Sequence, residues 1–446
     1  MRPCKKSAIL SLTVCLVIAV LAAPMTIHAQ GKAYTLKECI DRALKTDLTL
    51  VQTKGYFEQA KADALAAKGA FLPDLNWRIS GSYNHNKWTS FQDPITGAFV
   101  EGEFSQDVHG YQASLTTSLM LFDGFGNIFN MAMSNATVSS YRNKVSQQEL
   151  NTAYNVKSQY FNLLQAQATF KITQKALERT QELMKIAQTK YELGSASRSD
   201  VLKAKVSLSQ AQLDMLTSEN RVSKAQANLN YAIGEPVDQE IRVEDVEISG
   251  ADYSLADVST RALSSNPSHL SAQDDLRAAK HGLRSALSNY LPTLSLSASK
   301  YWIGPELGEM SDWWSKNYTT TIGGQLSFNI FDRFMTKRQN DYARANLHSA
   351  EYGVSDSKRA VELEAREAYL NLQETVKARE LSDEELASAQ EDYKLAQEKY
   401  TLGAATILDI LDAEVSLRTA ESHQVDSKYN YLLAVARLKT VMGIIE

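Results

Sequence analysis

The residues with the clearest chemical potential in this sequence are aspartates that follow two glycines. Asp409 and Asp412 follow Gly403, and their spacing of three places both carboxylates on one face of a helix. Carboxylates gathered in this way attract cations and repel anions. Asp200 follows Gly194 at the same distance as Asp409 follows Gly403. These aspartates are the candidate charged residues of a functional site.

Two of these aspartates have an alternative interpretation, in which the carboxylate stabilises the start of a helix and does not attract ions. Thr406 and Ser197 stand three residues before Asp409 and Asp200. This spacing fits a capping box, in which the carboxylate accepts a hydrogen bond from the first backbone amide of a helix. Both interpretations stay open for Asp200 and Asp409, whereas Asp412 lies too deep in the helix for a cap.

Motifs of known catalytic sites are absent from the sequence. The seven histidines include no zinc-protease pair with glutamate, and no glycine-rich phosphate loop occurs. Cys39 is the single cysteine beyond residue 29, so neither a disulfide framework nor a thiolate metal cluster can form. The net charge of −5 provides no basic field for nucleic acid. We expect no enzyme activity, no cofactor, no metal and no nucleic-acid partner.

Residues 1–29 have the pattern of a secretory signal peptide. Arg2, Lys5 and Lys6 precede an apolar stretch over residues 8–23, and Ala29 offers a small residue for cleavage. The alternative is a membrane anchor, but the stretch is shorter than the roughly 20 residues that span a bilayer. No comparable apolar run follows, so entry into a membrane would require strands.

An internal repeat organises the rest of the chain. Leu36 and Leu72-Pro73 recur as Leu255 and Leu291-Pro292 at a displacement of 219, whereas Phe122-Asp123 recurs as Phe331-Asp332 at 209. The first half therefore carries ten extra residues in one loop. We expect a first repeat over residues 30–234, an acidic connector over 235–252 and a second repeat over 253–446.

The hydrophobic period changes twice within each repeat. Residues 36–72 and 255–291 predict a helix that stops at a proline. Alternating apolar and polar residues then predict β-hairpins over 75–121 and 294–330. Next, proline-free segments predict helices of about 70 residues, on the order of 105 Å long. These helices turn near Gly194 and Gly403 into antiparallel partners with coiled-coil spacing.

Aromatic residues concentrate in the two predicted hairpins. All five tryptophans lie there: Trp77, Trp88, Trp302, Trp313 and Trp314. Aromatic residues flanking alternating strands are typical of the girdle of an outer-membrane barrel. The alternative is the core of a soluble sandwich, for which the sequence supplies no further strands.

Four amphipathic strands leave two open edges, which hydrocarbon does not tolerate. Two copies would give eight strands with a filled interior, and three would give twelve with room for a passage. The polar strand faces consist mainly of Ser, Thr and Asn, which suit contact with water. We therefore favour three copies.

The duplicated Leu-Pro strand entry, the Phe-Asp strand exit and the Tyr-x-x-Gly turn followed by Asp-x-Leu resemble the TolC-like outer-membrane efflux proteins. The resemblance covers residues 35–443. It implies an α+β membrane protein with internal duplication, in which long antiparallel helical hairpins form a tunnel and four strands per protomer join a trimeric 12-stranded β-barrel. It also implies a homotrimer in outer-membrane lipid that extends into the periplasm and works passively with a periplasmic adaptor and an inner-membrane transporter.

The resemblance also assigns roles at the turns. It implies that Asp409 and Asp412 form the periplasmic gate, and that the turns at Gly194 and Gly403 contact the adaptor. The sequence departs from the family pattern at Ala405, where the family has an arginine that holds the closed state. We expect another latch or cap there, with Tyr400, Asp200 and Arg198 as candidates.

Two other classes of protein share features with this sequence. A periplasmic coiled-coil adaptor or scaffold protein also uses a long helical hairpin, but it has one hairpin flanked by compact β-domains. An envelope enzyme on coiled-coil arms would need a globular segment, for which no residues remain. We therefore expect the exit duct of an efflux or type I secretion system.

Overall fold

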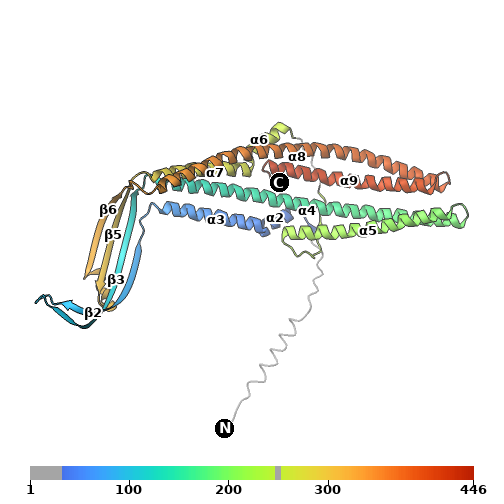
Figure 1. The fold of residues 1–446 in the computed structure, drawn as a ribbon. Coiled ribbons are helices and arrows are strands. Elements are labelled where there is room, and N and C mark those ends of the chain that lie inside the picture. The colour runs from blue at the N-terminus through green and yellow to red at the C-terminus, as the bar shows by residue number, and fades with distance from the viewer. Residues whose placement is uncertain (1–32, 247–252, 446) are drawn as a thin grey trace, which may run out of the picture.

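The computed structural model describes residues 33–246 and 253–445. Figure 1 shows long helices lying side by side and joined at one end to a four-stranded sheet, whose strands run at a steep angle to the helices. The expected α+β class with helical hairpins and four strands is confirmed. The expected signal peptide, residues 1–29, lies outside the described residues.

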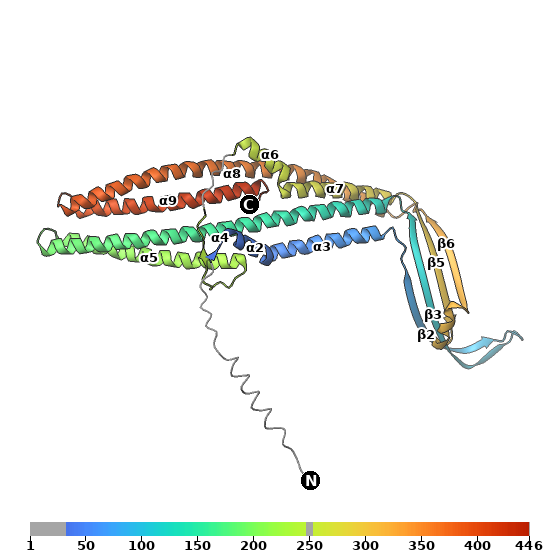
Figure 2. The same cartoon turned by 180° about the vertical axis from the view of Figure 1, so that it is seen from behind.

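Two long helical hairpins form most of the molecule. In the first, α4 (Gly126–Glu192) turns back into α5 (Arg198–Ile233), and in the second, α8 (Met335–Thr401) turns back into α9 (Ile407–Val441). Both α4 and α8 contain 67 residues, which corresponds to about 100 Å. The hairpins pack on each other along α4 and α9, as the views from both sides show (Figures 1 and 2).

The single helix expected between residue 36 and Leu72, and again from residue 255 to Leu291, is wrong. Each segment forms two helices: α2 (Leu36–Thr46), α3 (Leu48–Gly69), α6 (Leu255–Ser265) and α7 (Pro267–Ser288). Asp47 has extended backbone and begins α3 by accepting a hydrogen bond from the Leu50 amide at 2.7 Å. Asn266 takes the same place before Pro267. Local side-chain capping therefore bends both segments.

The sheet has the strand order β2–β3–β5–β6 and is antiparallel throughout. Its strands are β2 (Asn76–Gln92), β3 (Phe99–Phe122), β5 (Thr293–Gly304) and β6 (Tyr318–Ser327). The second hairpin thus ends at Ser327 and not at residue 330. Both β2 and β6 are edge strands that pair on one side only within the chain.

The two faces of the sheet differ in polarity because the strand period is two. On one face Ile79 lies opposite Ala113, and Leu119 lies opposite Leu296. On the other face Ser80 lies opposite Gln112, while β5 and β6 contribute serines, threonines and Gln325. The pairing therefore produces one apolar and one polar surface.

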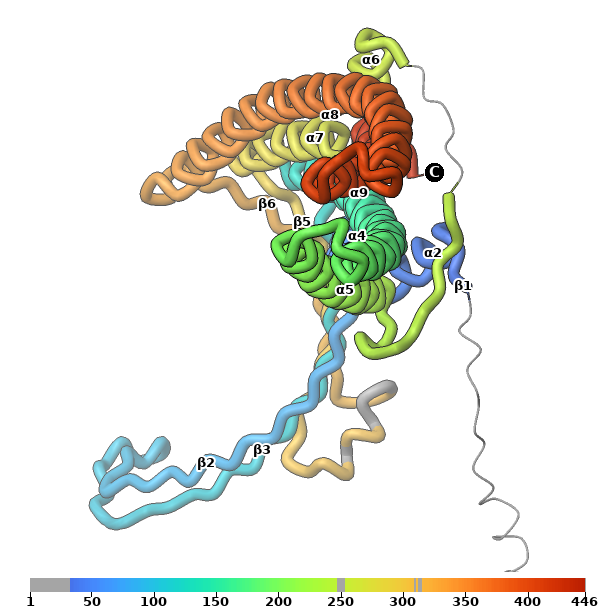
Figure 3. The backbone as a smooth tube through the Cα atoms, turned by 90° about the vertical axis from the view of Figure 1, so that its right-hand side faces the viewer, coloured from blue at the N-terminus to red at the C-terminus, as the bar shows by residue number. Residues whose placement is uncertain are grey.

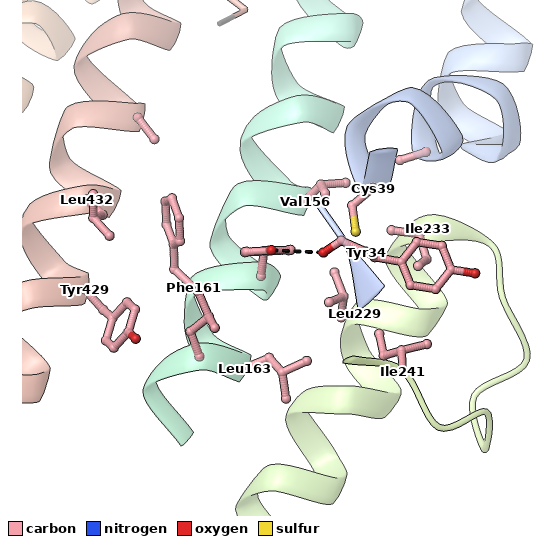
Figure 4. Close-up of a cluster of buried hydrophobic side chains, with 14 residues drawn as sticks. Tyr34, Cys39, Val156, Phe161, Leu163, Leu229, Ile233, Ile241, Tyr429 and Leu432 are labelled. Atoms are coloured by element: carbon pink, nitrogen blue, oxygen red, sulfur yellow. Dashed lines mark hydrogen bonds between the residues drawn. The ribbon is translucent and has the colours of Figure 1, made fainter. Parts of the chain in front are cut away.

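A hydrophobic core lies where the shorter helices meet the middle of α4. Strand β1 (Ala33–Tyr34) pairs in parallel with β4 (Arg242–Val243), which lies in the described part of the connector. The buried Tyr160 hydroxyl donates to the Glu244 carbonyl at 2.7 Å and lies 3.1 Å from the Tyr34 carbonyl. Figure 4 shows Tyr34, Leu229 and Ile233 gathered around Cys39. This core anchors the connector to the first hairpin.

The structure preserves the internal repeat element by element. Helices α2 and α3 recur as α6 and α7 at a displacement of 219, and α4 and α5 recur as α8 and α9 at 209. A buried hydroxyl pair, Thr173 with Ser218 at 2.7 Å, recurs as Ser382 with Ser427 at 2.7 Å. Seen along the helices, the two hairpins stack against each other and the sheet extends to one side (Figure 3). No described helix is sufficiently long and apolar to cross a membrane.

Candidate functional site

The two hairpin turns have the same geometry. Gly194 and Gly403 have φ of 75° and 76°, a left-handed conformation that glycine adopts without steric cost. The amides of Ser195 and Ala404 each donate at 2.8 Å to the carbonyl of the lysine five residues earlier. Nothing lies within 4 Å of a Cβ built on either glycine. Both turns are open to a partner.

Each return helix begins with a capping box. The Asp200 carboxylate accepts from the Ser197 amide at 2.9 Å, and the Asp409 carboxylate accepts from the Thr406 amide at 2.7 Å. The Ser197 and Thr406 hydroxyls complete the boxes. These hydrogen bonds hold the pKa of both aspartates below the usual range. The capping geometry is therefore formed at both aspartates.

Asp409 and Asp412 line one groove, as their spacing predicts. The groove lies between α8 and α9, has a volume of about 460 Å³, and is also lined by Asp392 and Lys399. Asp412 is exposed, and its carboxylate forms no hydrogen bond or ion pair with any described residue. The charge of Asp412 is thus available to solvent, whereas that of Asp409 also serves the helix cap.

Tyr400 is buried between the two hairpins. The Lys190 ammonium group lies 4.4 Å from the centre of its ring and donates a hydrogen bond to its backbone carbonyl. The Tyr400 hydroxyl has no hydrogen-bond partner among the described residues. Burial, with a contribution from the charge of Asp200, raises the pKa of Tyr400. Ala405 is half-buried and packs against this cluster.

The structure does not join all three latch candidates. Arg198 is exposed, and within residues 33–246 and 253–445 no hydrogen bond links it to Tyr400 or Asp200. The cation beside Tyr400 is Lys190, which sequence reasoning missed. The available signal was the repeated Lys-Tyr pair at residues 190–191 and 399–400.

A charged cluster joins the hairpins above the turns. The Arg179 guanidinium of α4 lies 3.1 Å from the Glu421 carboxylate and 3.5 Å from that of Glu414, both on α9. Glu414 is only 6% exposed, and this burial raises its pKa despite the nearby charges of Arg179 and Arg418. Sequence reasoning missed this cluster because Arg179 lies more than 230 positions from both glutamates.

The aromatic residues of the sheet do not all share one environment. Trp77 is 63% exposed on the apolar face, and Trp88 is half-buried. Trp302 departs from the girdle expectation, since its side chain is 1% exposed and lies over Gly304. The segment η1 (Leu307–Trp314) packs on the same strand, β5. A Cβ at Gly304 would collide with this indole. The side chains of Trp313 and Trp314 lie outside the described part of the structure.

No group of three or more His, Cys, Asp or Glu side chains could hold a metal ion within the described ranges. The side chains at the turns instead stabilise the helix ends and place charges at the surface. Helix caps fix the turns, a buried tyrosine and lysine join the hairpins, and carboxylates face a groove. Such a site can bind a partner or filter ions.

The chain is similar to one family of proteins over most of its length. The family model described as outer membrane efflux protein matches residues 39–235 and 258–444, once in each repeat. The alkaline protease secretion protein AprF of Pseudomonas aeruginosa is 23% identical over 85% of this chain and 78% of its own. The outer membrane protein TolC of Vibrio cholerae is 23% identical over 95% of this chain and 93% of its own.

Solved structures share the fold. CusC has a TM-score of 0.80 at 18% identity and covers 93% of each chain. The outer membrane protein VceC from Vibrio cholerae has a TM-score of 0.78 at 17% identity, covering 92% of this chain and 97% of its own. The Campylobacter jejuni CmeC outer membrane channel has a TM-score of 0.80 at 19% identity, with 92% and 85% covered.

Proposed function

This chain belongs to the outer membrane efflux protein family, and from that membership we propose that three copies form a passive exit duct gated at the hairpin turns. The protein is an outer-membrane channel of efflux or type I secretion that extends into the periplasm. Members of the family work with an adaptor and an inner-membrane transporter. The adaptor alternative considered for this sequence is not supported, because the family match covers both repeats.

The open-edged amphipathic sheet carries this proposal. Strands β2 and β6 leave unpaired backbone groups that hydrocarbon does not tolerate. Identical copies satisfy these groups by pairing β6 of one with β2 of the next. Three copies give twelve strands, whose polar faces would line a water-filled passage and whose apolar faces would contact outer-membrane lipid.

The gate is proposed at the end of the helices farthest from the sheet. A trimer would bring three copies of Asp409 and Asp412 around one axis, where their carboxylates would favour cations. The open turns at Gly194 and Gly403 would contact the adaptor. Tyr400, packed with Lys190, would hold the hairpins together in the closed state. The sequence contains no nucleotide-binding motif, so energy would come from the partner transporter.

The parts of the chain follow from this assignment. Residues 1–29 would direct export, residues 30–234 and 253–446 would each supply one half of the protomer, and residues 235–252 would link the halves outside the tunnel. Relatives carry names for alkaline protease secretion and for pyoverdine export. We propose that this chain serves a cargo of one of these two kinds, a protein or a small exported molecule.

Reconstitution tests the duct directly. The purified full-length protein is placed in planar bilayers, and its mass in detergent is measured by light scattering. We expect a mass of three chains and a cation-selective conductance that divalent cations block. A stable single-chain species without conductance would contradict the proposal.

A further inference from the structure

The contact between the two repeats inside one chain indicates how two copies of the chain could pack against each other. Within one chain, the end of the first repeat packs on the start of the second, through α4 against α7 and β3 against β5. Within residues 33–246 and 253–445, neither the corresponding end of the second repeat (α8 and β6) nor the corresponding start of the first (α3 and β2) has such a partner. A second copy can supply it.

The register of the sheet shows that the two repeats are equivalent position by position. Displacing the observed pair Asn76 and Thr116 by 219 and 209 gives Ser295 and Gln325. These two residues are indeed opposite each other in the second hairpin. The same displacements can therefore be applied to a residue pair that joins the two repeats inside the chain. The result is the equivalent residue pair that would join two copies.

Two glycines interrupt the interiors of the helices that would form this junction. Gly55 lies in α3 and Gly353 in α8, both are exposed, and nothing lies within 4 Å of a Cβ built on either one. Glycine is a poor helix former, and no contact among the described residues accounts for either glycine. Each has a tyrosine neighbour that projects from the helix: Tyr56 is 54% exposed and Tyr352 is 65% exposed.

One contact between α4 and α7 inside the chain has an equivalent position pair that contains Gly55 and Tyr352. Asn143 donates to the Asp274 carboxylate at 2.8 Å. The position equivalent to Asn143 in α8 is Tyr352, and the position equivalent to Asp274 in α3 is Gly55. A large side chain thus faces a position without one.

The adjacent internal contact transfers to the reciprocal pair. The Lys144 ammonium group lies 3.1 Å from the Asp275 carboxylate. The position equivalent to Lys144 is Gly353, and the position equivalent to Asp275 is Tyr56. Here α3 provides the large side chain and α8 the space, so the two helices are complementary in both directions.

We propose that a second copy of this chain docks its α3 against α8, with Tyr352 seated on the partner's Gly55 and the partner's Tyr56 seated on Gly353. The polar contacts between α4 and α7 inside the chain are thus replaced, between copies, by tyrosine rings that pack on glycines. This inference rests on the proposed function for the presence of several copies. It adds the register and the residues by which the copies recognise one another.

The sheet supports the same register. Thr117 pairs with Ala298 within the chain, and the transferred pair is Leu326 on β6 with Ile79 on β2. Both side chains are exposed in the single chain and lie on its apolar face. The docking that seats the tyrosines therefore also joins apolar residues with apolar residues across the new strand pair.

The hairpin turns support it independently. Lys190 on α4 contacts the ring of Tyr400 within the chain. The transferred pair is Lys399 with the partner's Tyr191, the same two residue types. Tyr191 is exposed in the single chain, whereas Tyr400 is buried. The contact between copies would bury Tyr191 as the contact between hairpins buries Tyr400.

Cysteine cross-linking in the full chain tests the register. The three cysteines of the chain, Cys4, Cys15 and the buried Cys39, are replaced by alanine. Gly55→Cys and Tyr352→Cys are then introduced together and oxidised with copper phenanthroline. We expect a shift from the one-chain band to two-chain and three-chain bands on heated, non-reducing gels. Each single-cysteine variant is the matched control and is expected to stay at the one-chain position. The pair Asn143→Cys and Asp274→Cys should close within one chain and give no ladder.

A size exchange provides a second readout that does not depend on oxidation. Gly55→Tyr alone should clash with Tyr352 and lower the trimer association constant by at least about tenfold. Adding Tyr352→Gly should restore it, because the ring and the space are only exchanged.

The outcomes separate this inference from the duct itself. A three-chain mass without cross-linking of Gly55→Cys and Tyr352→Cys, while the internal pair does close, would overturn the register and leave the trimer standing. Failure of Tyr352→Gly to rescue Gly55→Tyr would also overturn it. A single-chain mass for the unmodified protein would overturn the proposed function instead.

Discussion

At the scale of residues, the aspartates of the turns divide two tasks. Asp409 is engaged by the Thr406 amide and hydroxyl, whereas the Asp412 carboxylate faces the groove without a described partner. The Asp409 carboxylate can both cap the helix and contribute negative charge to the groove. Only the charge of Asp412 can be removed without loss of a helix cap. The gate proposal can therefore be tested separately from the stability of the turn.

We expect Asp412→Asn to lower the cation-to-anion permeability ratio several-fold while leaving the thermal unfolding temperature unchanged, because it removes only an exposed charge. The measurement is the reversal potential in a salt gradient across a planar bilayer. Lys203→Gln, at the equivalent position of the first repeat, is the matched control. An unchanged reversal potential for Asp412→Asn would exclude it from the ion filter.

The capping boxes predict acid sensitivity at the turns. The folded-state pKa of Asp200 and Asp409 is lowered, so each group stabilises the helix start above its usual pKa and loses this effect as pH falls through the lowered value. Hydrogen-exchange protection at residues 194–200 and 403–409 should therefore drop below about pH 4. Ser197→Ala and Thr406→Ala should each weaken the turn by about 1 kcal/mol at neutral pH. Equal protection at pH 3 and pH 7 would contradict this prediction.

At the scale of elements, the contact of α4 with α9 holds the two hairpins together. Apolar packing near the turns, including Leu183, Ile407 and Ile410, combines with the ion pairs of the half-buried Arg179 with the buried Glu414 and the half-buried Glu421. Removal of one partner from a buried ion pair is costly because the remaining charge loses its compensation. The cluster thus resists separation of the hairpins.

We expect Arg179→Ala to destabilise the protomer by about 3 kcal/mol at neutral pH. The loss should shrink toward acid pH, because the pKa of Glu414 is already raised by burial and protonation removes its uncompensated charge. Denaturant unfolding at pH 7 and pH 5 measures both effects. Combining Arg179→Ala with Glu414→Gln is the control and should recover part of the loss. A loss that does not depend on pH would contradict the role given to Glu414.

At the scale of the whole molecule, the four-stranded sheet has open edges that further strands would have to pair with in a membrane. One face is apolar, and β2 and β6 remain unpaired on one side. The long hairpins extend away from the sheet (Figure 1), and in the proposed trimer they would form the wall of a tunnel. The two repeats make this possible, since the junction inside one chain can recur between chains.

Adjacent residues of β6 test the orientation of the sheet. Ile322 lies opposite Ala298 on the apolar face, and Thr321 lies opposite Ser299 on the polar face. Ile322→Arg should make folding into lipid vesicles less favourable by about 2–4 kcal/mol at the bilayer midplane, whereas Thr321→Arg should change conductance with little effect on folding. Urea titrations in vesicles measure the first and bilayer recordings the second. Equal costs for the two substitutions would contradict the assigned faces.

The amino-acid sequence by itself determined the internal repeat, the two β-hairpins, the two long helical hairpins and their order. The 209-residue and 219-residue displacements, the alternation of Trp77 and Ile79 with polar residues, and the glycine turns at 194 and 403 are local or periodic signals. Local backbone preference and the hydrophobic period fix such features before any tertiary contact forms. The breaks at Asp47 and Asn266 were also local, but a helical period on both sides concealed them.

Only the tertiary structure decided which distant side chains meet. The contact of Lys190 with Tyr400, the pairing of Arg179 with Glu414 and the burial of Trp302 depend on how each helix or strand is rotated and shifted against its neighbour. A period of 3.6 or 2 fixes which face of an element is apolar, but it does not fix which residue of that face meets a partner 200 positions away. That choice follows from packing, in which the close fit of all side chains selects one register among several of similar hydrophobicity.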